Sequence, residues 1–306
     1  MAEAEIPEVR PKSGKLFHYT SSLGALGIIG QGCIRATDLS YLNDRRELFH
    51  GLDLFVRYAA EISPGFGALV AGHAMKLREE PLAQSRLAAA CFCEQGTLLS
   101  QWRGYGKSSG YALGFDFDGL NSGPYPTERP TKVVYKTNEQ EEVVSNFLDE
   151  AFIMWPEIEA VMQSSPKAPD DPGAEYRRVM TQFAENHMLP IWITSGLFKH
   201  PSFSEEDEWR IIHPMFWWKP GEPDWNPSEG HRQLKTEYRG GPMGITPFVS
   251  IPLKNQNGLM PLSDVIVGPG PNEQERCVAM KMLLSTHGYD VDAISVWTSG
   301  LPYRPS

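Results

Sequence analysis

Short apolar segments alternate with polar turns along much of the chain, and their lengths predict strands. Several of these segments are rich in Val, Ile, Phe or Tyr, and glycine or proline bounds them, as is typical of strands in a half-buried sheet. The predicted strands are residues 15–19, a segment near Ile34, and residues 88–93, 110–117, 132–135, 208–215, 246–252 and 265–268.

Other segments repeat their apolar residues every three or four positions, which predicts helices. Leu48, Leu52, Phe55 and Ala59 follow this spacing after Asn43-Asp44, a pair that is typical of a helix cap. The other predicted helices are residues 23–29, 67–80, 98–105, 141–162, 174–188 and 272–287. Residues 164–173 and 219–241 are rich in Pro, Gly and charged residues and are predicted to be loops.

The uneven spacing of these elements predicts the fold class. Some strands are separated by hairpin distances and others by helices, which favours an α+β fold over a regular doubly wound sheet. We expect a flexible segment at residues 1–14 and a single domain at residues 15–306, with a helical insertion at about 139–190.

Composition narrows the function classes. With 28 Lys and Arg against 38 Asp and Glu, the net charge of −10 argues against broad electrostatic binding to nucleic acid or to an anionic membrane. The four cysteines include a Cys-x-Cys pair that is too tight for a usual zinc or redox motif, so we expect reduced thiols. No run approaches the ~20 apolar residues of a membrane span, and we expect a cytoplasmic protein.

A series of short motifs carries a resemblance to a known family. The chain resembles a bacterial family of uncharacterised domains from about residue 16 to residue 304, through motifs that are individually weak but occur in the family's order. These motifs are residues 16–21 (LFHYTS), 26–29, 32–35, Asn43-Asp44 with Glu47, residues 91–93 (CFC), 99–106 (LSQWRGYG), 110–115, 198–200, 206–210 (EDEWR) and 299–304 (SGLPYR).

That family in turn resembles the ADP-ribosyltransferase fold of the His-Tyr-Glu type. The resemblance implies a split mixed or antiparallel sheet with peripheral helices, and NAD as the substrate. His18, Tyr19 and Thr20 would stand for the first-strand motif that binds the nicotinamide end, with Tyr19 in place of the usual glycine. Phe92 takes the place of the second-strand tyrosine, and Glu208 that of the catalytic glutamate.

The chemistry of NAD cleavage suits these residue types. Breaking the nicotinamide–ribose bond builds positive charge on the ribose, which a fixed carboxylate such as Glu208 stabilises. A neutral His18 can bond to ribose hydroxyls, and an aromatic ring of Phe92, Trp102 or Tyr105 can stack on nicotinamide. Strand alternation places Glu206 beside Glu208, as in transferases that modify arginine.

Each of these residues also has a structural interpretation, which the sequence leaves open. A lone strand histidine is often satisfied within the core. Alternation also places Arg210 beside Glu208, where the two can form an ion pair without any chemistry. Arg45, with its neighbour Arg46, is either a diphosphate clamp or a solvated face, and Trp102 and Tyr105 are also interpretable as core packing.

Three functions therefore remain. The first is an NAD-dependent ADP-ribosyltransferase or NAD glycohydrolase with an unknown acceptor, an effector in bacterial conflict or phage defence as the family resemblance implies. The second is a catalytically silent binding module of the same fold. The third is a metal-dependent hydrolase or nuclease using Asp44, Glu47, Asp207 and Glu208, against which the carboxylates show no compact ligand spacing.

Overall fold

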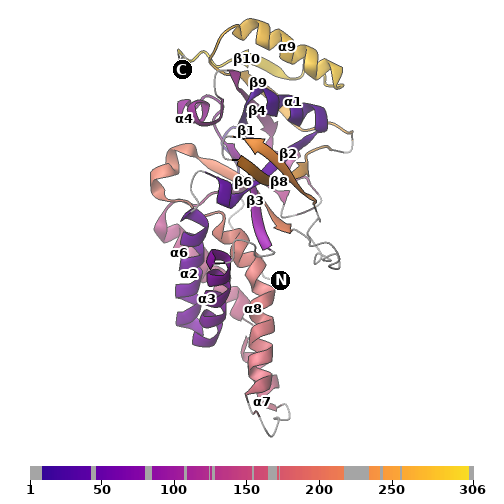
Figure 1. Cartoon of the computed structure of the whole chain (residues 1–306). Helices are drawn as coiled ribbons and strands as arrows, with labels where there is room; N and C mark the ends of the chain where they lie inside the picture. Colours follow the sequence, from indigo (N-terminus) through magenta and orange to yellow (C-terminus); the bar gives the residue numbers. More distant parts are fainter. Residues whose placement is uncertain are drawn as a thin grey trace. The chain divides into compact units, whose positions relative to one another are not determined.

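The chain forms two compact units in the computed structural model (Figure 1). The structure describes residues 9–42, 46–79, 85–106, 109–123, 125, 128–153, 155–164, 171, 173–216, 234–241, 244–255 and 257–302. Residues 39–87 and 134–201 form a helical unit, and residues 9–38, 88–133 and 202–306 form a unit built on a sheet. The predicted α+β class is confirmed, whereas the division into one domain with an insertion stays a prediction.

The described strands make one open, mixed, 10-stranded sheet. Its main path runs in the order β10-β9-β4-β1-β3-β2-β8-β7, and β6 pairs with β3 and with the short β5. The strands are β1 Lys15–Thr20, β2 Cys33–Asp38, β3 Ser85–Cys93, β4 Tyr111–Asp116, β5 Thr131–Lys132, β6 Glu208–Phe216, β7 Thr236–Gly241, β8 Gly244–Pro252, β9 Leu262–Val267 and β10 Ser295–Thr298. Along the main path, neighbouring strands are antiparallel except β9 and β10, which are parallel.

The sheet opens between β1 and β3. β1 pairs with β4 along its whole length, from Lys15↔Asp116 to Thr20↔Tyr111, but its register with β3 is limited to Phe17↔Cys93. On its other side, β3 pairs with β2 at Thr37↔Ala89 and Asp38↔Ala88. The part of β1 that begins at His18 therefore separates from β3.

Alternation along β1 sends its side chains into two different cores. Leu16 belongs to the larger core, which also contains Phe92 of β3 and Trp209 of β6. Phe17 and Tyr19 belong to a smaller core on the other face, together with Trp102.

Helices complete the sheet unit. α1 Ser22–Gln31 begins at Ser21, whose hydroxyl accepts from the Gly24 amide, and ends at Gly32, which adopts the left-handed conformation with φ 68° that favours glycine. α1 and α9 Glu273–Thr286 both contribute to the larger core. Other helical segments of this unit within the described residues are α4 Leu99–Gln101, a π-helical turn Trp102–Gly106, α5 Phe117–Asn121 and a 3-10 helix Pro201–Glu206 that begins at the unit boundary.

The helical unit has its own apolar core. α2 packs against α3, α6 and α8, and α3 also packs against α8, as Figure 1 shows. Its helical elements are a 3-10 turn Leu39–Tyr41, α2 Arg46–Ile62, α3 Pro64–Glu79, α6 Thr137–Phe152, α7 Trp155–Ser164 and α8 Ala174–Ser195. No described helix combines the length and the apolar character that crossing a bilayer requires.

Three predicted elements were wrong in detail. The stretch at residues 219–241 was predicted to be a loop, but it ends in β7, which pairs with β8 through the register Glu237↔Phe248. The helix predicted at 141–162 is two helices, α6 and α7, and the strand predicted at 132–135 is confined to β5 and one bridge, Val134↔Phe198. β10 was not predicted from the sequence.

Candidate functional site

His18 lies where β1 leaves β3. Its ring Nδ1 is 2.8 Å from the main-chain oxygen of Cys91, so the side chain spans the gap that the two strands open. A carbonyl oxygen has no proton to give, so this contact requires a protonated Nδ1. The neutral His18 ring therefore carries its lone pair on Nε2.

The surroundings of His18 keep the ring neutral. Burial lowers the pKa of His18 below its ordinary value of 6.5, and the positive charge of Arg239 lowers the pKa further, although the hydrogen bond to Cys91 acts in the opposite direction. The ring centroid of Phe92 lies 5.8 Å from that of His18, at an interplanar angle of 59°. The structure thus brings two of the predicted site residues together, on the face of the larger core.

Tyr19, Trp102 and Tyr105 are arranged differently. Tyr19 and Trp102 are buried on the face of β1 opposite to His18, with ring centroids 4.8 Å apart and edge-on. The Tyr19 hydroxyl donates to the oxygen of Gln95 at 2.7 Å and accepts from the amide of Leu98 at 2.8 Å. These contacts give Tyr19 and Trp102 a packing role, whereas Tyr105 is 43% exposed.

Thr20, at the end of β1, faces the first turn of α1. Its hydroxyl occupies the space that a side chain at Gly24 would need, so Gly24 allows β1 and α1 to approach closely. Arg45, the predicted clamp for diphosphate, lies outside the described residues, as does Asp44.

Glu208 begins β6 and is buried with Arg210. Arg210 Nε lies 2.8 Å from one carboxylate oxygen of Glu208, and Arg210 Nη2 lies 3.0 Å from the other. The exposed fractions of the two residues are 3% and 2%. The ion pair that the sequence left open is therefore present, and it is bidentate.

Glu206 does not share the strand with Glu208. It ends the 3-10 helix Pro201–Glu206, and Asp207 follows with φ 46°, a left-handed conformation that interrupts the two-residue period before β6 begins. The prediction that alternation sets Glu206 beside Glu208 is wrong for this reason. Lys132 contacts the carboxylates of Asp207 and of Glu94, which anchors the turn.

Two arginines that the sequence did not single out lie on the strands beyond β3. Arg35 of β2 and Arg239 of β7 both lie over the ring of Phe248, with guanidinium carbons 5.0 and 5.8 Å from its centroid. Arg239 also donates to the hydroxyl of Thr37 at 2.9 Å. No local pattern marks Arg239, because β7 (TEYRGG) has few apolar residues and lies in a stretch rich in Pro and Gly.

Residues 101–211 match the family model of a protein of unknown function, DUF2971. This match supports membership of the chain's central third in an uncharacterised domain family and names no activity. No curated protein sequence matches the chain, and no solved structure matches its fold.

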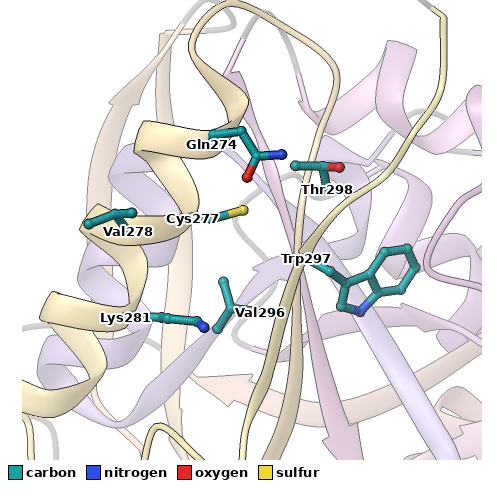
Figure 2. A pocket seen from close by; sticks show the side chains of 7 residues that line it. All are labelled: Gln274, Cys277, Val278, Lys281, Val296, Trp297 and Thr298. Atoms are coloured by element: carbon teal, nitrogen blue, oxygen red, sulfur yellow. The ribbon is translucent and has the colours of Figure 1, made fainter.

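A separate cavity of about 360 Å³ opens between α9 and β10 (Figure 2). Its lining is mostly apolar or neutral, with the Lys281 amine as its charged group, and it contains no carboxylate or imidazole. β10 lies three strands away from β1 in the sheet, so this cavity is distinct from the surroundings of His18. The residues that line it are Gln274, Cys277, Val278, Lys281, Val296, Trp297 and Thr298.

Metal ligands do not gather in the part of the chain that the structure describes. Within it, no group of three His, Cys, Asp or Glu side chains is placed to hold an ion. The side chain of Glu47 lies outside this part. Of the carboxylates named for a metal-dependent hydrolase, Asp207 contacts Lys132 and Glu208 contacts Arg210.

Proposed function

We propose that the sheet unit binds NAD at the opening between β1 and β3 and cleaves its nicotinamide–ribose bond, as an ADP-ribosyltransferase or an NAD glycohydrolase. The observation that carries the proposal is the His18–Cys91 contact, which holds a neutral imidazole in one tautomer at the point where the sheet splits. A split sheet with a histidine on its first strand is also what the resemblance to the His-Tyr-Glu transferases implies.

His18 would bind the substrate, and Phe92 would position His18. The lone pair on His18 Nε2 accepts a hydrogen bond from a ribose hydroxyl, and a neutral ring adds no positive charge beside a ribose that becomes cationic. The ring of Phe92 packs against the His18 ring and supports its orientation. In this scheme Phe92 is a positioning residue, because it is only 1% exposed.

The reaction breaks one bond and forms another at the anomeric carbon of the ribose. The electron pair of the C–N bond leaves with nicotinamide, whose ring nitrogen thereby becomes neutral. A nucleophile, either water or a group on the acceptor, forms the new bond and loses its proton to solvent water. We assign the stabilising carboxylate to Glu208.

A second candidate is favoured by the Glu208–Arg210 pair. Both carboxylate oxygens of Glu208 are engaged by Arg210, and an arginine at this distance offsets the negative charge that an oxocarbenium ion requires. A module that binds NAD without cleaving it is consistent with this pairing. The two candidates share the His18 site and differ in whether nicotinamide is released.

The test measures binding and cleavage separately. Purified protein is incubated with NAD labelled in the nicotinamide ring, with and without cell lysate, and its melting temperature is measured with and without NAD. Cleavage predicts nicotinamide release by the wild type, reduced at least 100-fold in His18→Ala and in Glu208→Gln. His287→Ala is the matched control, because its Nδ1 also contacts a main-chain oxygen, at 2.9 Å, but at the exposed C-terminal cap of α9.

Three outcomes separate the candidates. Release that depends on His18 and Glu208 supports the enzyme, and labelled product in the lysate distinguishes transfer from hydrolysis. A rise in melting temperature without release supports the binding module, because a ligand that binds only the folded state stabilises it. Neither release nor stabilisation in the wild type contradicts both.

A further inference from the structure

Arg35 of β2 and Arg239 of β7 lie on the same face of the two strands that flank β8. β2 pairs with β8 at Arg35↔Ser250, and β7 pairs with β8 at Arg239↔Thr246. Ser250 and Thr246 are separated by four residues on β8, so alternation directs both to one face, with Phe248 between them. The two guanidinium groups therefore converge on Phe248 from both sides, as their distances to its ring show.

Neither arginine is neutralised within the described residues. No described carboxylate lies within ion-pair distance, 4 Å, of either guanidinium group. The nearest acid along β7, Glu237, accepts a hydrogen bond from Ser250 at 2.6 Å instead. Both arginine residues are exposed, so their remaining donors are open to a ligand.

Packing on Phe248 does not account for two cations. A cation over an aromatic ring gains about 0.5–1 kcal/mol at an exposed site, and one arginine is enough for that contact. A second arginine adds like-charge repulsion, and the pKa of Arg239 is lowered by burial and by the charge of Arg35. A bound anion offsets the repulsion between the two arginines, because it attracts both guanidinium groups.

Contacts connect this arginine pair to His18. Arg239 donates to Thr37, and Thr37 pairs with Ala89 of β3. Two residues further along β3, the Cys91 oxygen contacts the His18 ring. The charge of Arg239 is also close enough to act on His18. By strand alternation the arginine side chains lie on the face of Phe17 and Tyr19, and His18 lies on the opposite face, so a ligand that contacts both must pass through the opening between β1 and β3.

We propose that Arg35 and Arg239 bind the diphosphate group of a dinucleotide whose ribose reaches His18. Guanidinium groups suit this ligand, because their planar donors match phosphate oxygens in pairs. The inference rests on the proposed function for the identity of the dinucleotide. It makes the phosphate groups, rather than the nicotinamide ring, the main source of affinity.

The experiment uses the full chain and three ligands. Isothermal titration calorimetry measures the Kd of NAD, of ADP-ribose, which keeps the diphosphate, and of nicotinamide riboside, which lacks it. The variants are Arg35→Gln, Arg239→Gln and the double variant, with Arg239→Lys keeping the charge but losing the paired donors. Arg178→Gln, which removes the same charge from an exposed position on α8, is the matched control. Melting temperatures establish that each variant is folded.

We expect each glutamine variant to weaken NAD and ADP-ribose at least tenfold, and Arg239→Lys to lie between the wild type and Arg239→Gln. Nicotinamide riboside should bind wild type and variants within twofold. Higher salt should weaken the binding of the diphosphate ligands to the wild type more than to the double variant.

Equal Kd values for NAD in wild type and double variant would overturn the arginine site while leaving NAD cleavage standing. Binding of ADP-ribose that depends on both arginines, without nicotinamide release, would support the site and contradict the enzyme. A wild type that binds neither NAD nor ADP-ribose would overturn the site.

Discussion

Arg210 holds both carboxylate oxygens of Glu208 in a buried pair two residues apart on β6. Taking two charges out of water is costly, and the pair recovers this cost only while both partners remain. Their two hydrogen bonds leave little freedom for either side chain. The pair therefore determines the stability of β6 whether or not Glu208 also acts in catalysis.

We predict that Arg210→Met lowers the free energy of unfolding by about 3–5 kcal/mol, because it removes the arginine that contacts both oxygens of the buried Glu208 carboxylate. The double variant Glu208→Leu with Arg210→Met should recover much of that loss, since both charges of the pair are then removed. Urea denaturation measures both. Arg178→Met, which breaks the exposed pair with Glu175, should leave the urea midpoint unchanged. A similar small effect for Arg210→Met would show that the buried pair does not hold β6.

Titration of His18 gives a second prediction. Because burial and the charge of Arg239 lower the pKa of His18 in the folded state, the unfolded state binds more protons below about pH 6.5. The contribution of His18 to the free energy of unfolding is therefore fully present above that pH. It is lost as the pH falls toward the folded-state pKa, with a slope of at most about 1.4 kcal/mol per pH unit.

NMR of the His18 ring measures this directly. We expect a titration midpoint below 6.5 in the wild type and a higher midpoint in Arg239→Gln, because a neighbouring positive charge is removed. The pKa of His73 in the helical unit is also lowered, by burial and then by Lys76, and it should not respond to Arg239→Gln. A midpoint of His18 that is unchanged in Arg239→Gln would contradict the proximity of the two residues.

Local patterns predicted most of the elements of both units. Strand β1 and the helices α1, α3 and α9 follow from alternation, helical period and glycine at their ends, because each signal lies within the element itself. β7 was not predicted from such patterns. Its sequence, TEYRGG, has few apolar residues, and β8 stabilises it through main-chain pairing, which side-chain patterns do not encode.

The site was predicted only in part, because local motifs do not mark contacts with distant residues. His18 and Phe92 were named from their motifs, and they are in contact. Their geometry depends on the Cys91 carbonyl oxygen, 73 positions from His18, which no local pattern marks. Glu206 was misplaced because the left-handed turn at Asp207 is held by Lys132, 75 positions away. Predictions failed where a main-chain group or a distant partner sets the conformation.

Glu94, which contacts Lys132 as Asp207 does, gives a third prediction. Burial raises the pKa of Glu94, but hydrogen bonds from Lys132 at 2.6 Å, the Lys12 amide at 3.1 Å and the Trp209 indole at 3.0 Å outweigh it, so the net pKa is lowered. Glu94 therefore contributes stability above its ordinary pKa of 4.5, and the contribution is lost as the pH falls below that value.

Removing Lys132 should make the protein more sensitive to acid. In Lys132→Met, burial still acts on Glu94 without its main partner, so the pKa of Glu94 rises and acid unfolding begins at a higher pH than in the wild type. Circular dichroism during acid titration measures the midpoint. Lys136→Met, which removes an exposed pair with Glu139, is the control and should leave the midpoint in place. Equal midpoints for the wild type and Lys132→Met would contradict this role.

The last prediction concerns two glycines in α3 that differ in their surroundings. A Cβ atom at Gly67 would lie 2.5 Å from Ala60 Cα and 2.7 Å from Ala60 N in α2, whereas a Cβ atom at Gly72 would meet nothing within 4 Å. Alanine at either position favours the helix by about 1 kcal/mol relative to glycine. At Gly67 the main chain of α2 cannot yield as a flexible side chain would, and overpacking costs typically about 1–3 kcal/mol. We therefore expect Gly72→Ala to raise the urea midpoint of the helical unit and Gly67→Ala to lower it. If both substitutions raised the midpoint, the close approach of α2 and α3 at Gly67 would be wrong, because helix propensity alone would then explain both results.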